Sequence, residues 1–217
     1  MLLIMIINLK NKPFNLIFVH IQKCGGTSII NFFDVWKNHN KIFKDIQFIK
    51  KNNLKLNNYF KFTVIRNPWD RIVSFFHYHK QKIKNDNFPT RTWEYIKDLN
   101  FTQFIRSPQF EFWSKRNNIT DYIKYKNVAC VDYYLDFNNL KKDFELIKSM
   151  TGINKNLSHI NKSKHENYQK YYKNPKNKEI IECLFKDEIK FFNFKFGMPT
   201  NFKNLNNKKI ITKFFEK

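Results

Sequence analysis

The stretch FVHIQKCGGTSIINFF, residues 18–33, predicts the end of a buried strand, a glycine-bearing loop and the start of a helix. Residues 15–20 (NLIFVH) form a short, continuous apolar run, which is typical of a strand buried on both faces. Gly25 and Gly26 are half of the only four glycines in the chain. Glycine is favoured where the backbone bends unusually or approaches another group closely. Behind them, apolar residues at helical spacing predict a helix: Ile29, Ile30, Phe33 and Trp36.

The same order of elements recurs along the chain. Residues 59–65 (YFKFTVI) predict a second buried strand, and a helix follows it at residues 69–82. Asn67 and Pro68 mark the start of that helix, because asparagine caps helices and proline at the first helical position loses no needed hydrogen bond. Residues 127–135 predict a third strand.

Two further helices complete the predicted pattern. One starts near residue 136 or 138 and ends at Gly152, and the last runs from about residue 177 to Gly197. Because strands alternate with helices, we expect an α/β fold with three layers, a parallel sheet with flanking helices, in a P-loop-like nucleotide-binding architecture. The expected parts of the chain are an N-terminal extension, one domain and a basic C-terminal tail, over residues 1–13, 14–197 and 198–217.

The formal net charge of +22 leaves two interpretations open. A polyanion such as nucleic acid or a sulfated or carboxylated glycan would be attracted to such a chain. Compositional drift is the alternative, because lysine and asparagine are abundant throughout and no dense basic run or arginine-rich arm is present. The charge therefore predicts no specific nucleic-acid partner.

The cysteines and the N-terminus point to a soluble, cytoplasmic protein. The three cysteines are odd in number and far apart, so they predict neither a disulfide framework nor a zinc site: Cys24, Cys130 and Cys183. Cys130 lies in an apolar run and is expected to be buried. The apolar N-terminal run is far shorter than the roughly 20 residues of a membrane-spanning helix, and it lacks the features of a signal peptide. We expect an extra strand or a loosely held extension there.

The loop from Lys23 to Ser28 is a candidate anion site. The amides of a loop that opens a helix point at one spot, and the helix dipole favours negative charge there. Lys23 adds a full charge, and Thr27 and Ser28 add hydroxyl donors. The order K-C-G-G-T-S differs from the Walker A loop, in which the lysine follows the glycines. An ordinary strand-to-helix turn with a surface lysine is the alternative.

A second candidate anion site follows the second strand. Arg66 lies at the carboxyl end of that strand, where ligands bind in open parallel sheets, and Ser74 falls two turns along the next helix. An arginine and a hydroxyl can hold a phosphate through charge-assisted hydrogen bonds. A solvated arginine beside a capping asparagine is the alternative. Two anion sites at successive strand ends suggest a ligand with two separated phosphate groups.

These residues resemble those of the carbohydrate-type sulfotransferases, the sulfotransferase family 2-like proteins. FVHIQKCGGTS is similar to the family's 5′-phosphosulfate loop, usually H-I-P-K-T-G-G-T-S, and FTVIRNPWDRIVSFFHY is similar to its 3′-phosphate motif, R-N-P-x-x-R-x-x-S. VDYYLDFNNLKKDFELI, LSHINKSKHENYQKYY and IKFFNFKF resemble further family segments, so the resemblance covers about residues 14–197. The sequence departs from the family pattern at Gln22, Cys24 and Asn138.

The resemblance implies transfer of a sulfuryl group from 3′-phosphoadenosine 5′-phosphosulfate (PAPS), a co-substrate, without a metal. The acceptor group would be a hydroxyl, less readily an amine, of a carbohydrate. The loop residues implied to hold the 5′-phosphosulfate are Lys23, Cys24, Gly25, Gly26, Thr27 and Ser28. The residues implied to hold the 3′-phosphate and close over the nucleotide are Arg66, Ser74, Lys162 and Ser163.

The general base is less well marked than the anion sites. Family relatives often carry a histidine or an acid between the two phosphate motifs, where this sequence offers His39 and Asp45. We take His39 as the base, with Lys23 as the second catalytic residue. His77 and His79 lie on the second predicted helix, and packed or solvated positions are expected for both.

Two other functions stay open. One is a nucleotide or small-molecule kinase of related fold, against which the position of the lysine before the glycines argues. The other is a catalytically inactive protein that keeps the fold and binds polyanions. Salt-sensitive binding of nucleic acid or heparin, without any response to nucleotides, would indicate the second.

Overall fold

The structure is a computed structural model that describes residues 6–35, 39–84, 91–158 and 165–200, apart from the side chains of residues 91 and 92, and residues 202, 205, 206, 212 and 214. The chain divides into two compact units. The first unit comprises Met1–Arg66, Ile119–Asn161 and Asn201–Lys217, and the second comprises Asn67–Asn118 and Lys162–Thr200. The extension, domain and tail expected from the sequence stay predictions, because two compact units can belong to one domain.

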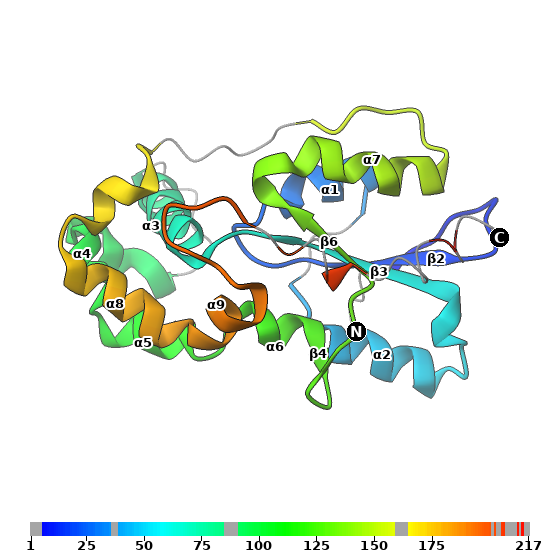
Figure 1. Cartoon of the computed structure of the whole chain (residues 1–217), viewed down its shortest axis with the longest axis horizontal. Helices are drawn as coiled ribbons and strands as arrows, with labels where there is room; N and C mark the ends of the chain where they lie inside the picture. The colour runs from blue at the N-terminus through cyan, green and yellow to red at the C-terminus, as the bar shows by residue number, and fades with distance from the viewer. Residues whose placement is uncertain are drawn as a thin grey trace. The chain divides into compact units, whose positions relative to one another are not determined.

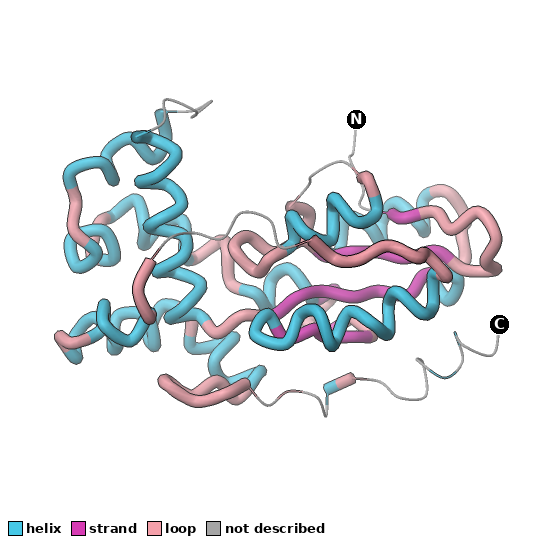
Figure 2. Tube along the Cα trace, turned by 90° about the horizontal axis from the view of Figure 1, so that it is seen from above, coloured by secondary structure: helices cyan, strands magenta, loops and turns pink. Residues whose placement is uncertain are grey.

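A four-stranded sheet forms the centre of the first unit, in the order β1-β2-β3-β6 (Figure 1). β2 (Asn15–Val19), β3 (Tyr59–Ile65) and β6 (Tyr133–Asp136) are parallel neighbours. β1 (Ile6–Ile7) pairs antiparallel with β2, so part of the N-terminal run forms an extra strand. Figure 2 shows the strands of this unit side by side in magenta. The predicted α/β fold is confirmed, although β1 makes the sheet mixed instead of wholly parallel.

Helices cover both faces of this sheet, which gives the three expected layers. α1 (Gly26–Phe33) and α7 (Leu140–Thr151) lie on one face, and α2 (Ile42–Lys51) lies on the other (Figure 1). The Phe32 ring of α1 packs edge-on against Phe144 of α7, with 4.8 Å between centroids. The other elements of the unit are short: η1 (Leu56–Asn58), α6 (Ile119–Ile123), β4 (Lys124–Tyr125), β5 (Val128–Ala129) and η3 (Phe137–Asn139).

β2 and β3 are buried on both faces, as their apolar sequences predict. Phe18 and Phe62 are almost fully buried and stack with 5.1 Å between ring centroids. The Thr63 hydroxyl donates to the Val19 carbonyl at 2.7 Å, which joins the two strands near their carboxyl ends. Because parallel strands end at the same edge of a sheet, the loop after β2 and Arg66 after β3 leave that edge side by side.

The predicted third strand at residues 127–135 is wrong in its extent. β5 forms a hairpin with β4, and only Tyr133–Asp136 joins the main sheet as β6. Asp132 explains the break, since its carboxylate accepts from the Lys61 amide at 2.8 Å and pairs with the Lys61 ammonium at 2.6 Å. Cys130, expected to be buried, is half-buried between the two pieces.

Part of the basic C-terminal tail packs on the first unit. The Phe214 ring lies edge-on to Phe14 and Phe60, with centroid distances of 5.0 and 5.3 Å. The Asn206 side chain accepts from the Tyr134 amide at 2.7 Å and donates to the Tyr134 carbonyl at 3.4 Å. These residues therefore cover core aromatic rings and pair with the backbone of β6.

The second unit consists of helices around an aromatic core. α3 (Pro68–Lys84) begins as predicted, with the Asn67 side chain accepting from the Asp70 amide at 2.8 Å. Phe75 is buried among Trp93, Phe104 and Trp113. The other helices are η2 (Arg91–Asp98), α4 (Phe101–Ile105), α5 (Pro108–Ser114), η4 (Tyr168–Tyr172), α8 (Pro175–Leu184) and α9 (Lys186–Phe192).

The single last helix predicted from residue 177 to Gly197 is wrong, because two helices occupy this segment. α8 begins earlier, at Pro175, where the Asn174 side chain accepts from the Lys176 amide at 3.0 Å. Phe185 leaves the helical conformation, with φ −117° and ψ 23°, and separates α8 from α9. The Phe185 side chain is fully buried, so the apolar pattern of the sequence continues through the break.

Candidate anion-binding site

The loop between β2 and α1 has an unusual backbone. Lys23 and Gly25 are in the left-handed region, with φ of 63° and 79°, while Cys24 between them has no positive φ. Alternation of this kind turns successive amide N–H groups into a concave, anion-binding arrangement. α1 begins directly behind the loop, at Gly26, so the positive end of its helix dipole lies at the loop. The loop thus has the backbone chemistry that an anion site needs.

The two positions of the loop that carry glycine require it for different physical reasons. Gly25 takes the left-handed conformation, and a Cβ there would lie 3.1 Å from Cδ2 of Phe137. Gly26 has ordinary helical geometry, but a Cβ there would lie 2.1 Å from Cδ2 of the buried His20 ring. Packing inside the protein therefore requires both glycines. Their predicted role, the approach of backbone amides to an anion, stays a prediction.

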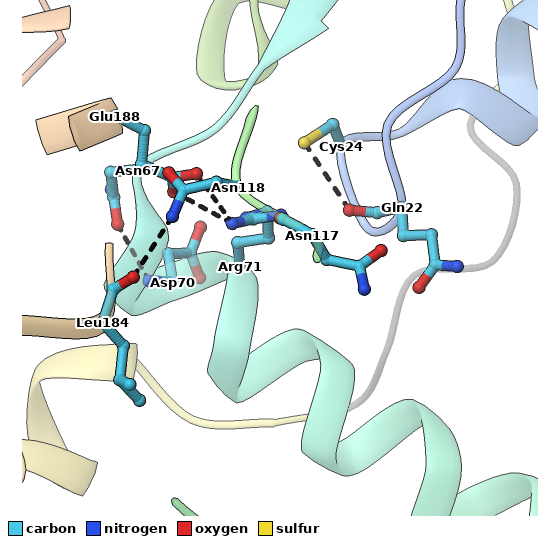
Figure 3. A network of polar contacts seen from close by, with 9 residues as sticks. All are labelled: Gln22, Cys24, Asn67, Asp70, Arg71, Asn117, Asn118, Leu184 and Glu188. Carbon is cyan, nitrogen blue, oxygen red and sulfur yellow. Dashed lines mark hydrogen bonds and ion pairs between the residues drawn. The ribbon is translucent and has the colours of Figure 1, made fainter. Parts of the chain in front are cut away.

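The side chains of the loop differ in exposure. Lys23 and Thr27 are half-buried, whereas Ser28 is buried and its amide donates to the Gly25 carbonyl at 3.2 Å. Cys24 is buried, and its thiol points at the Gln22 carbonyl 3.7 Å away (Figure 3).

Arg66 joins the loop from the neighbouring strand end. Its Nη1 donates to the Lys23 carbonyl at 3.0 Å, and its Cζ lies 4.0 Å from the centroid of the Phe137 ring. Only 6% of the Arg66 surface is exposed. An arginine has five N–H donors in a planar fork, so one bond to the loop does not use up its capacity. The structure therefore brings together the lysine of the first predicted anion site and the arginine of the second.

His39 lies against His20, the residue that packs on Gly26. The two ring centroids are 4.0 Å apart, and His39 Nδ1 lies 3.1 Å from the His20 carbonyl oxygen. A carbonyl can only accept, so Nδ1 carries the hydrogen of this bond. In the neutral ring Nε2 is then the nitrogen that can take up a proton. The His20 ring thus lies next to both Gly26 of the loop and the predicted base, His39.

The structure does not test the other predicted site residues. Ser74 lies in α3 of the second unit and is buried. Lys162 and Ser163 fall outside the described residues. All three stay predictions from the sequence motifs.

His77 and His79 occupy packed positions in the second unit, as expected. His79 is buried, with its ring 4.1 Å from Phe75. His77 is half-buried and stacks on His165, with 5.5 Å between ring centroids. Burial, and then the nearby charges of His165 and Lys80, lower the pKa of His77 to about 4. This histidine is therefore neutral near pH 7.

Two residues that the sequence analysis did not single out have clear roles. Arg71 forms a buried bidentate ion pair with Glu188, at 2.9 and 3.0 Å (Figure 3). Phe137 contacts Arg66, and its ring occupies the space next to the Gly25 backbone. Both lie inside quoted family-like segments, but nothing in the local pattern identifies their partners.

The described part of the chain shows neither a metal-binding cluster nor a membrane-spanning helix. Within the described ranges, no group of three or more His, Cys, Asp or Glu side chains is arranged to hold a metal ion. Among the helices that the structure describes, none is long and apolar enough to cross a membrane.

Comparison with known proteins identifies the family. Residues 9–195 match the model of the Sulfotransferase family. No curated protein and no solved structure gives a match. Because the family match extends over most of the chain, the chain belongs to the sulfotransferase family, and the predicted family is confirmed.

Proposed function

We propose that this member of the sulfotransferase family transfers a sulfuryl group from PAPS to a hydroxyl, less readily an amine, of a carbohydrate acceptor. Family membership supports sulfuryl transfer in general; the donor and the acceptor class are our proposal. One observation carries it: Arg66, at the end of β3, donates to the carbonyl of Lys23 in the left-handed loop after β2. Two groups suited to anions thus adjoin at one edge of the sheet.

The two ends of the donor bind to different groups in this proposal. The 5′-phosphosulfate binds to the Lys23 ammonium, to the amides of the loop over residues 25–27 and to the hydroxyls of Thr27 and Ser28. The 3′-phosphate binds to Arg66 through guanidinium donors other than the one shared with Lys23. Ser74, Lys162 and Ser163 are further ligands that the motifs predict.

The transfer itself is an in-line displacement at sulfur. The acceptor oxygen forms a bond to sulfur while the bond from sulfur to the bridging phosphate oxygen breaks, and 3′-phosphoadenosine 5′-phosphate (PAP) leaves with the electron pair. Lys23 and the loop amides stabilise the charge that builds up on the bridging oxygen. His39 Nε2 takes the proton of the acceptor hydroxyl. Charge stabilisation by these groups makes transfer independent of added divalent metal in our proposal.

A labelled-donor assay tests the proposed reaction. The protein is incubated with PAPS labelled on sulfur and a mixture of carbohydrates, with EDTA, and transfer of label and release of PAP are measured. We expect both in equal amounts. Transfer from the γ-phosphate of ATP that requires Mg²⁺ would instead identify a kinase. Salt-sensitive binding of heparin without transfer would identify an inactive polyanion-binding protein.

A variant of the proposed base tests the role of His39. His39→Ala should lower kcat by about 100-fold or more, because a positioned general base contributes roughly 10²–10⁴-fold. The KM for PAPS should change little, since His39 acts on the acceptor. His77→Phe, which changes a histidine of the second unit, is the control and should keep its kcat. Full turnover by His39→Ala would remove this residue from the mechanism.

A further inference from the structure

We propose that Phe137 is a positioning residue of the anion site, whose ring fixes the Arg66 guanidinium and closes against the loop at Gly25. The inference rests on the proposed function, in which Arg66 binds the 3′-phosphate of the donor. No motif assigned a role to Phe137, which is half-buried and lies in η3 directly after β6.

Two contacts place the Phe137 ring between the strand end and the loop. Arg66 Cζ lies 4.0 Å from the ring centroid, within the range of a cation–π interaction. A Cβ on Gly25 would lie 3.1 Å from Cδ2 of the ring and 3.2 Å from Cε2, so the ring directly borders the loop backbone. Together with the bond from Arg66 to the Lys23 carbonyl, these contacts connect ring, guanidinium and loop in a closed arrangement.

The register of the sheet explains why these residues meet. Ile65 of β3 lies opposite Asp136 of β6, so Arg66 and Phe137 are the next residues along two parallel neighbours. Both leave the sheet at the edge where the loop after β2 begins. The contact therefore follows from strand topology, and it does not depend on a long flexible segment.

The turn that carries Phe137 is held in place on both sides. The Asp136 carboxylate accepts from the Asn138 amide at 2.9 Å, and the Asp136 amide donates to the Asp143 carboxylate at 2.8 Å. Asp136 and Asp143 are both buried. These hydrogen bonds fix the turn, so the Phe137 ring is held in one position. A ring held in this way can restrict the motion of the Arg66 guanidinium.

The ring adds a contact that restrains Arg66 and, through it, the loop backbone at Lys23. A long arginine side chain loses rotamer freedom when it orders, and a stacked guanidinium has lost part of that freedom before a phosphate arrives. Lys23 is a non-glycine residue with φ of 63°, a conformation that persists only where surrounding contacts hold it. The Arg66 bond to its carbonyl is such a contact, and Phe137 keeps Arg66 in position to make it.

Hydrogen exchange of the ligand-free protein directly tests whether Phe137 holds the loop in place. The probes are the amides of Cys24 and Ser28, which donate to the carbonyls of Ile21 and Gly25. In Phe137→Ala they should exchange about 3- to 30-fold faster than in the wild type, the range expected from loss of a partly desolvated cation–π contact. Phe137→Tyr, which keeps the ring, should behave as the wild type, and Phe137→Leu, which keeps bulk only, should resemble alanine.

Phe48→Ala is the matched control, because Phe48 is half-buried in α2 of the same unit, and α2 lies on the face of the sheet opposite α1 and α7 (Figure 1). It should leave loop exchange unchanged. Equal loop exchange in Phe137→Ala and wild type would overturn the inference, and so would a leucine variant that exchanges as slowly as wild type.

Titration with PAP separates this inference from the proposed function. Phe137→Ala should raise the Kd for PAP about 3- to 30-fold by the same contact, with little change for AMP, which lacks the 3′-phosphate. If the wild-type protein binds no PAP, the proposed donor is wrong, whereas the exchange result still decides whether Phe137 holds the loop.

Discussion

Arg66 and Arg71 stand five residues apart in one motif, IRNPWDR, and the structure uses them differently. Arg71 is 1% exposed and pairs through both oxygens of Glu188, which is fully buried (Figure 3). Arg66 donates to a backbone carbonyl and stacks on an aromatic ring, two groups that carry no charge. The carboxylate cancels the charge of Arg71, whereas these two neighbours of Arg66 do not cancel its charge. The same residue type thus stabilises the fold in one unit, whereas in the other we propose that it binds an anion.

Arg71 also ties together distant parts of its own unit. Its Nη1 donates to the Asn117 carbonyl at 3.1 Å, and its partner Glu188 lies on α9, 117 residues along the chain. Next to it, the Asn118 side chain donates to the Leu184 carbonyl at 3.1 Å (Figure 3). This network holds α3, the segment before residue 119 and the α8–α9 bend as one body. Stability of the second unit therefore depends on Arg71 more than on any exposed ion pair.

The largest effect should follow from breaking that buried pair. Arg71→Met leaves Glu188 buried without its partner, which costs about 3–5 kcal/mol of the free energy of unfolding. The melting temperature should fall by roughly 6–20 °C for a chain of this size. Adding Glu188→Leu should recover much of the loss, because the unpaired charge is removed.

An exposed ion pair provides the control for this prediction. Lys115 and Glu111 form an i,i+4 pair whose side chains are 64% and 55% exposed. Lys115→Met should change the free energy of unfolding by less than about 1 kcal/mol. If Arg71→Met melts at the wild-type temperature, the structural half of the comparison is contradicted.

Lys23 should show the opposite behaviour, with a large effect on rate and a small one on stability. Lys23→Met removes the charge proposed to stabilise the leaving oxygen, and loss of one such group costs about 10²–10³ in kcat. The side chain is half-buried, so the melting temperature should stay within a few degrees of the wild type. Lys44→Met, an exposed lysine of α2, is the control for overall charge. Equal kcat in both variants would contradict the proposed role.

A smaller effect should come from the glycine that His20 covers. Gly26→Ala puts a Cβ into the buried ring and should destabilise the protein by about 1–3 kcal/mol. Gly152→Ala should cost about 1–2 kcal/mol through its left-handed φ of 69°, although nothing lies within 4 Å of the added carbon. Only Gly26→Ala should also weaken PAP binding. Equal loss of binding in both variants, measured by calorimetric titration, would show a global effect instead.

The smallest predicted effect concerns pH and the second unit. Because burial lowers the pKa of His77 from 6.5 to about 4, the unfolded chain binds a proton between these values that the folded chain does not. Stability should therefore fall as the pH drops from about 6.5 towards 4. His77→Phe removes this contribution, so its melting temperature should fall less between pH 7 and pH 5 than that of the wild type. Identical pH dependence would contradict the assignment.

The sequence predicted those parts of the structure that depend on neighbours along the chain. Apolar runs located β2 and β3, and the Asn67 cap located the start of α3. The paired glycines indicated the loop before α1, because a left-handed conformation and a tight packing contact both favour glycine at the position itself.

What the sequence did not predict depends on contacts between distant residues. Lys61 interrupts the third strand by pairing with Asp132, 71 residues further along the chain. The ion pair of Arg71 spans 117 residues, and Phe137 reaches Arg66 only because β3 and β6 are neighbours in the sheet. Local patterns contain no information on such partners, so these contacts were not predicted, whereas the loop between β2 and α1 was.

The most direct test of the central claim is a thermal-shift titration with PAP against AMP and ATP, on the wild type, Arg66→Met and the exposed-arginine control Arg106→Met. At about 100 times its Kd, PAP should stabilise the wild type and Arg106→Met by about 2.7 kcal/mol, a rise of roughly 5–10 °C. AMP and ATP should give smaller rises, and Arg66→Met should lose the preference for PAP. The absence of any rise with PAP, or an equal rise with AMP, would contradict the claim that Arg66 and the Lys23 loop bind the sulfuryl donor.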